Sequence, residues 1–112
     1  MRLLPLDLMN RLLDNNVRAR EADHMPVVKF FLPGTAMTWL FTEMERDGDT
    51  LFGLADLGMQ CPELGYASLI ELEGVRSRMG LRVERDLHFK AIRTLSEYTA
   101  LARASGSLSD IL

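Results

Sequence analysis

The chain has 112 residues, of which 47% are hydrophobic and 26% charged, and its net charge is −3 at pH 7. This composition is typical of a globular protein and excludes a disordered chain. The mild acidity argues against non-specific binding to nucleic acid, which needs a clustered basic surface. We expect one domain over residues 1–112, in which residues 106–112 are the candidate for a flexible tail.

The sequence contains few of the residues and motifs that usually bind metals or cofactors. Cys61 is the single cysteine, so no intramolecular disulfide can form, and a reducing cytoplasm is the expected compartment. The two histidines, His24 and His88, match no spacing of zinc ligands. No glycine-rich phosphate-binding motif occurs, and no run approaches the roughly 18 apolar residues of a membrane span. We therefore expect no metal, no cofactor and no membrane association.

The first third of the chain predicts a helix followed by strands. Leu4, Leu8 and Leu12 recur every four residues, which indicates one apolar helix face. The Asn15-Asn16 pair is a plausible helix end, and residues 17–25 are then a loop. Strands are predicted over residues 27–32, 38–45 and 50–57, because these runs are rich in β-branched and aromatic residues.

Two details refine the predicted sheet. Alternation over residues 38–45 places Trp39, Phe41 and Glu43 on one face of the second strand. The Asp47-Gly48 turn then joins the second and third strands as a hairpin. Short connections of this kind predict an antiparallel meander.

Residues 63–89 organise the rest of the chain. Residues 63–67 can be extended, and Ser68 with Glu71 forms a capping box that starts a helix, which we expect to end at Met79-Gly80. Residues 81–89 alternate as a fourth strand or an extended arm. A second capping box, at Thr94, starts a last helix. The prediction is an α+β fold: a small antiparallel sheet of three to four strands with N-terminal, middle and C-terminal helices.

Several short motifs occur in an order that resembles one bacterial family, the domain of unknown function 2958. They are KFF, TW, LFGL, ELGY, SLIEL and ERDLHF, which begin at residues 29, 38, 51, 63, 68 and 84. The resemblance covers roughly residues 1–100 and departs at Pro5 and Ala67, where members often have a polar capping residue and a phenylalanine. It implies a small cytoplasmic protein of plasmids, phages and other mobile elements, and it carries over no catalytic residues.

The leading functional hypothesis is a non-enzymatic module that binds a protein partner. The resemblance further associates the chain with inhibition of a host defence system, such as a CRISPR or restriction complex. Trp39 and Tyr66 are the favoured anchors, because exposed aromatic residues dominate interfaces. Core packing is the alternative for both residues. The other candidates for protein binding are Glu43, Glu63, Arg85, Asp86 and His88.

Two alternative functions belong to other classes of protein, an enzyme and a nucleic-acid-binding protein. A small hydrolase or nucleotide-modifying enzyme would bring Glu63, Asp86 and His88 together as an acid–base set. An accessory nucleic-acid-binding protein would use a modest basic cluster of Arg76, Arg78, Arg82 and Arg85. For each set the competing interpretation is structural: ion pairs, a histidine packed at a strand end, or a solvated face. The sequence does not define the oligomeric state.

Overall fold

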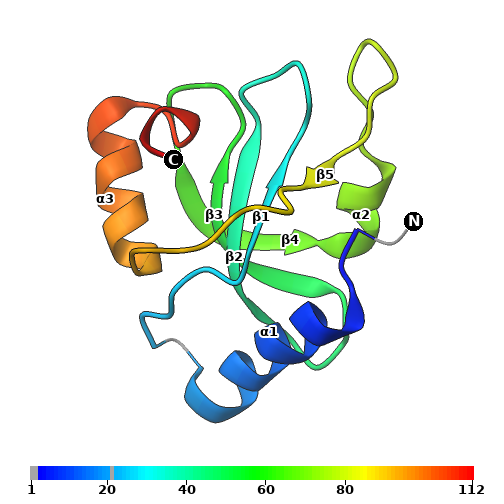
Figure 1. Ribbon diagram of the computed structural model, residues 1–112, viewed down its shortest axis with the longest axis vertical. Coiled ribbons are helices and arrows are strands. Elements are labelled where there is room, and N and C mark those ends of the chain that lie inside the picture. The colour runs from blue at the N-terminus through cyan, green and yellow to red at the C-terminus, as the bar shows by residue number, and fades with distance from the viewer. Residues whose placement is uncertain (1–2, 21) are drawn as a thin grey trace.

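The computed structural model describes residues 3–20 and 22–112, so Glu21, inside the predicted loop, lies outside the described residues. Figure 1 shows the elements in order. They are α1 (Leu6–Ala19), β1 (Val28–Phe31), β2 (Thr38–Met44), β3 (Thr50–Asp56), β4 (Glu63–Ser68), α2 (Leu69–Gly74), β5 (Glu84–Arg85), α3 (Leu95–Ser105) and the 3-10 helix η1 (Ser109–Ile111).

The strands form one antiparallel sheet in the order β4-β3-β2-β1-β5. The predicted α+β class, with N-terminal, middle and C-terminal helices, is confirmed. The described sheet has five strands because both ambiguous segments contribute. Residues 63–68 pair with β3 along their whole length, whereas only two residues of the predicted strand over 81–89 pair with β1.

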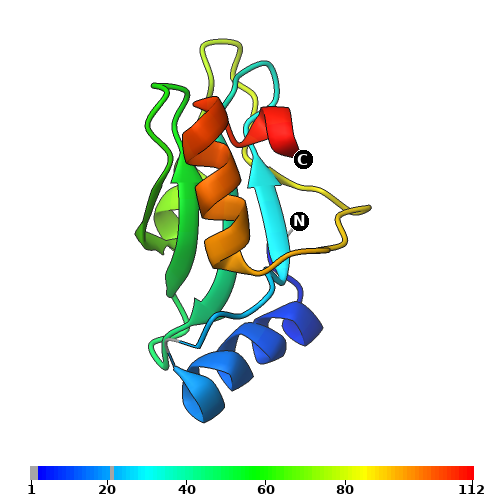
Figure 2. The same cartoon turned by 90° about the vertical axis from the view of Figure 1, so that its left-hand side faces the viewer.

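Each face of the sheet has its own hydrophobic cluster. Leu12 of α1 packs on one face with Phe30, Trp39 and Phe41. On the opposite face, α3 covers Leu40 and Leu54 of the central strands. Figure 2 shows α3 lying along the strands while α1 crosses at one end of the sheet. β4 lies at the sheet edge, and its Leu64 and Tyr66 side chains are exposed.

Two helix ends differ from the prediction. The helix α1 continues through Asn15 and Asn16 to Ala19, because both side-chain amides find partners on β2 instead of capping the helix. The helix α2 starts at the predicted Ser68 cap but ends at Gly74, where Val75 is already extended. Glycine weakens a helix by about 1 kcal/mol relative to alanine, so a six-residue helix stops there readily.

The C-terminal residues contain a buried anchor. The Leu108 side chain is fully buried in the cluster beneath α3. Its backbone N–H donates to the Asp56 carboxylate at 2.8 Å, and the other Asp56 oxygen accepts from the Gly58 N–H at 2.9 Å. Asp56 is only 1% exposed. These two bonds satisfy its carboxylate oxygens, because a polar group that is buried without hydrogen bonds costs free energy.

Candidate functional site

A β-bulge in β2 determines which side chains reach the open part of the sheet. Phe41 pairs with Gly53, but the next pair is Glu43 with Phe52, so Thr42 is an extra residue. A bulge of this kind reverses the facing of the residues after it. The prediction that Glu43 shares a face with Trp39 and Phe41 is therefore wrong. Met44 takes that place in the core cluster, and Glu43 lies on the opposite face.

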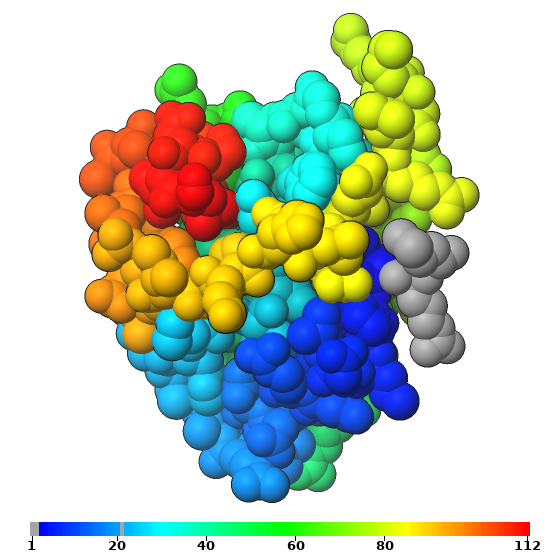
Figure 3. Space-filling view, viewed as in Figure 1, coloured from blue at the N-terminus to red at the C-terminus, as the bar shows by residue number. Residues whose placement is uncertain are grey.

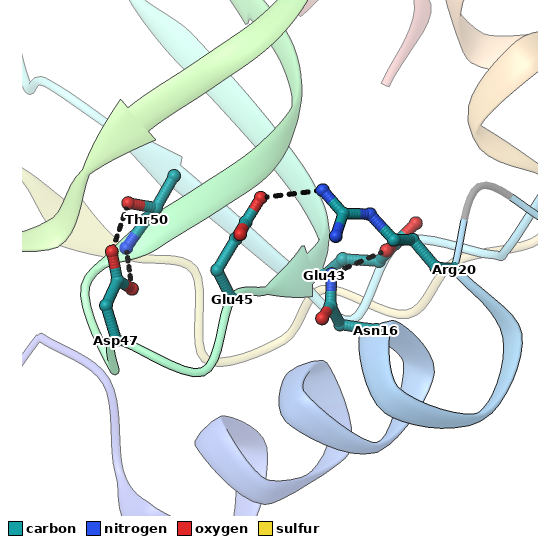
Figure 4. A network of polar contacts seen from close by, with 6 residues as sticks. All are labelled: Asn16, Arg20, Glu43, Glu45, Asp47 and Thr50. Atoms are coloured by element: carbon teal, nitrogen blue, oxygen red, sulfur yellow. Dashed lines mark hydrogen bonds and ion pairs between the residues drawn. The ribbon is translucent and has the colours of Figure 1, made fainter.

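The two asparagines near the end of α1 hold the bulge. Asn15 Nδ2 donates to the carbonyl oxygen of Thr42 at 2.9 Å. Asn16 Nδ2 donates to Glu43 Oε1 at 3.1 Å, a contact shown in Figure 4. The Asn15 bond satisfies a carbonyl of the interrupted ladder, and the Asn16 bond fixes a carboxylate that is 3% exposed. The end of α1 thus positions both residues of the bulge.

A groove of about 550 Å³ lies where α1, the sheet and the start of α3 meet. We call it the bulge groove. The residues that matter for its chemistry are Asn16, Glu43, Phe52, Leu64, Tyr66 and Ser96. It combines a hydrogen-bonded acid at the bulge with apolar side chains from β3 and β4, which is the usual make-up of a recognition surface.

An aromatic pair forms the outer wall of the bulge groove. The Phe52 and Tyr66 rings lie 5.1 Å apart, centroid to centroid, at an interplanar angle of 52°. Tyr66 is 59% exposed and Leu64 on the same strand is 41% exposed. Both side chains point to the same face of β4, since residues two apart share a face. Tyr66 is therefore held by its neighbour while most of its ring faces solvent.

Charged and polar contacts stabilise the elements that surround the bulge groove. Arg20 pairs with Glu45 at 3.1 Å on the adjoining hairpin (Figure 4). On the other side, Asp23 accepts hydrogen bonds from both the side-chain hydroxyl and the backbone N–H of Ser96, at 2.5 and 2.9 Å. These two bonds, the hydroxyl first, hold the pKa of Asp23 below its usual value. They tie the loop after α1 to the first turn of α3.

The two aromatic candidates have different environments. Trp39 is 4% exposed and belongs to the hydrophobic core, so the core interpretation holds for this residue and its side chain is not available to a partner. Tyr66 is exposed and lines the bulge groove. Of the two predicted anchors, Tyr66 is the one whose side chain is exposed.

The proposed acid–base set is not assembled. Glu63 begins β4 and Asp86 follows β5, at opposite edges of the sheet with three strands between them. At about 4.8 Å per strand, that separation is roughly 19 Å along the sheet. His88 is exposed in a turn and shares no strand face with Asp86. This separation removes the geometric basis for shared catalysis by the three residues.

The Asp86 and Glu63 carboxylates each form contacts with neighbouring residues that explain their positions without a catalytic role. Asp86 accepts from the His88 backbone N–H at 2.9 Å and pairs with Lys29 at 3.3 Å. The backbone bond and then the lysine keep the pKa of Asp86 low. Glu63 accepts from the Cys61 thiol at 3.2 Å, and this bond with the nearby charge raises the pKa of Cys61. A raised pKa makes the thiol less nucleophilic near neutral pH.

Three of the four arginines of the basic cluster, Arg76, Arg78 and Arg82, lie on a projecting hairpin and not on a helix. Residues 75–82 leave the body of the protein as the yellow-green arm in Figure 3. The backbones of Arg76 and Arg82 form an isolated antiparallel β-bridge across the hairpin, and Arg78 lies near its tip. The Arg76 guanidinium donates hydrogen bonds to the backbone carbonyls of Glu73 and Val75. Arg85 is separate from the arm: its Nε donates to the Leu3 carbonyl.

Sequence patterns alone missed Asn16, Phe52 and Leu64 as members of the site. In the sequence, Asn16 resembles a helix end, and Phe52 and Leu64 are ordinary strand residues. The sequence does predict Glu43 as a candidate, but its alternation pattern places this residue on the face opposite to the observed one. No local signal marks the bulge, because its evidence is the register between two strands.

The fold and the groove define an α+β protein with an open sheet edge and a partly apolar surface groove. Within residues 3–20 and 22–112, no three acidic, histidine or cysteine side chains are grouped to hold a metal ion. No helix of that described portion has the length and apolarity of a membrane span.

The model of a family described as a protein of unknown function (DUF2958) matches residues 3–109. The chain belongs to this family, which confirms the resemblance found in the motifs. No curated protein and no solved structure matches the chain.

Proposed function

We propose that this chain is a non-enzymatic module that binds a protein partner at the bulge groove. The observation that carries the proposal is the Tyr66 ring, 59% exposed yet held against Phe52. A tyrosine that is already positioned loses little conformational freedom on binding and makes a strong anchor. Leu64 extends the apolar surface, and the Asn16–Glu43 pair offers polar atoms beside it.

The separation of Glu63 from Asp86 supports binding over catalysis, since it leaves the enzyme hypothesis without its proposed set. The finer expectation, a partner from a host defence system, rests on the family resemblance. Identification of the captured partner decides it.

The test is affinity capture from a lysate of the source organism with the immobilised chain. Wild type and Ile92→Ala should retain the same partner, because Ile92 is 76% exposed but lies outside the groove. Tyr66→Ala should lose the partner, and Tyr66→Phe should keep most of the binding. Equal retention by Tyr66→Ala, or no retained partner with wild type, would contradict the proposal.

Nucleic-acid binding is a second candidate because one observation favours it. The hairpin of residues 75–82 collects Arg76, Arg78 and Arg82 on one projecting arm, with Met79 85% exposed near the tip. A two-stranded ribbon fits the major groove of DNA. Three phosphate contacts would give a salt slope of about −2.7. Titration with duplex DNA at two salt concentrations tests this candidate, and an absent or salt-independent signal rejects it.

A further inference from the structure

The outer side of β4 is an open strand edge. β4 ends the strand order, with β3 as its neighbour among the described strands. The Leu69 N–H donates to the Asp49 carbonyl at 2.9 Å, which marks these two residues as a hydrogen-bonded pair of the ladder. Antiparallel pairs alternate, so residues 63, 65 and 67 bond to β3. Leu64 and Tyr66 therefore direct their N–H and C=O groups away from β3, toward the open edge.

The sequence of β4 does little to block another strand. Lysine, proline or several charges commonly protect exposed edges. Within β4, ELGYAS, the one charged residue is Glu63, and proline is absent. A Cβ atom added at Gly65 would meet nothing within 4 Å, so the middle of the strand is also sterically open.

We propose that a second copy of this chain occupies the edge, with the two β4 strands antiparallel about a twofold axis at Gly65. In this register Leu64 of each copy lies opposite Tyr66 of the other copy. These are the residues whose backbone groups point outward, so both pairs form complete hydrogen-bonded pairs with four N–H to C=O bonds in total. A second copy in this register therefore pairs all the outward backbone groups of Leu64 and Tyr66. Any extended strand matches the backbone in this way, so the choice of a second copy rests on the side chains.

The side chains fit the same register. Leu64 and Tyr66 are exposed on one face, and aromatic–aliphatic pairs across strands are stabilising. Glu63 lies opposite Ala67, so no two carboxylates face each other. The two Glu63 side chains are four residues apart along the strand, roughly 13 Å. Pro62, which has no N–H, and the start of α2 after Ser68 limit the pairing to residues 63–67.

The dimer would join the two sheets and bring the two bulge grooves side by side on one surface. Each groove would gain a residue from the other copy, because Leu64 of one copy packs against Tyr66 of the other. The inference is independent of the proposed function, since it concerns the purified chain without any partner.

The most direct test is a disulfide at the twofold axis. Gly65 faces itself in a non-hydrogen-bonded pair, where Cα atoms are about 4.5 Å apart, within the range of disulfides. Gly65→Cys in a Cys61→Ser background should form a covalent dimer on mild oxidation. Ala67→Cys in the same background is the control, because residue 67 faces Glu63 of the other copy. Equal cross-linking of the two variants, or none with Gly65→Cys, would overturn the proposal.

A second measurement uses the intact chain. Sedimentation over a range of concentrations should give twice the 12.7 kDa mass of one chain. Tyr66→Pro should give the mass of one chain, since proline removes an outward N–H and leaves the bonds to β3 in place. Its circular dichroism spectrum checks that the variant is folded. A wild-type chain that remains at the single-chain mass would reject the dimer and leave the edge to an extended segment of another protein.

Discussion

Asn15 on α1 donates a hydrogen bond from Nδ2 to the carbonyl oxygen of Thr42, 2.9 Å away and 27 positions along the chain. Thr42 is the extra residue of the β2 bulge, so this bond links the end of the first helix to the irregularity that turns Glu43 toward the groove. Bulges are frequent beside functional sites because they redirect a side chain. Here the redirected side chain is a buried acid.

Asn15→Ala should lower the free energy of unfolding by about 1 kcal/mol, since the Thr42 carbonyl loses its side-chain donor. Urea denaturation measures the change. Asn10→Ala is the matched control: Asn10 lies on the same helix but is exposed, and alanine there should be neutral or slightly stabilising. Equal effects of the two substitutions would show that the Asn15 bond does not stabilise the bulge.

Gly53→Ala should be severely destabilising. Gly53 lies opposite Phe41, next to the bulge, and an added Cβ would lie 1.9 Å from the Leu40 carbonyl oxygen and 2.8 Å from Phe41 Cα. Backbone atoms cannot move aside cheaply, so we expect a loss of about 3 kcal/mol or more. Thermal unfolding of Gly53→Ala and Gly65→Ala gives the comparison, because Gly65 has open space on the adjacent strand. Comparable melting temperatures would contradict the packing at the bulge.

Leu108→Ala should cost about 3 kcal/mol, as expected for a fully buried leucine. Leu108 is 0% exposed, whereas Leu112 is 42% exposed and serves as the control. Chemical denaturation of both variants measures the difference. If Leu108→Ala were as stable as Leu112→Ala, the C-terminal residues would not be anchored beneath α3.

Asp23 should make stability depend on pH in the acidic range. Its folded-state pKa lies below the usual value because Ser96 donates to the carboxylate. The ionised form therefore stabilises the folded chain above pH about 4, and this stabilisation is lost as pH falls through the folded-state pKa. Asp23→Asn should be less stable than wild type at pH 7, and its stability should fall less between pH 5 and pH 3. Parallel curves for the two proteins would contradict the assignment.

The elements with strong local signals were predictable from the sequence. The Thr94 capping box forms as expected, with Thr94 and Glu97 bonding reciprocally, because a cap depends on residues three positions apart. The predicted strands over residues 38–45 and 50–57 begin at the observed first residues and end one residue beyond the observed ends, since β-branched and aromatic runs between turns define them.

The site was harder to predict from the sequence, because the contacts that form it join residues far apart in the chain. Asn15 and Asn16 resemble a helix stop until β2 provides their hydrogen-bond acceptors. The face of Glu43 depends on a register shift against β3, which period-two alternation along one strand cannot reveal. The exposure of Tyr66 likewise depends on where α3 packs and which strand lies at the sheet edge.

The central claim is that Tyr66 in the bulge groove anchors a protein partner. Its most direct test is the dissociation constant of the captured partner for wild type, Tyr66→Ala and Met79→Ala. Met79 is a suitable control because it is exposed on the separate arginine-bearing hairpin. We predict that Tyr66→Ala weakens binding about 30-fold, the loss of about 2 kcal/mol expected at an interface anchor, and that Met79→Ala leaves binding unchanged. Weaker binding with Met79→Ala and unchanged binding with Tyr66→Ala would contradict the claim.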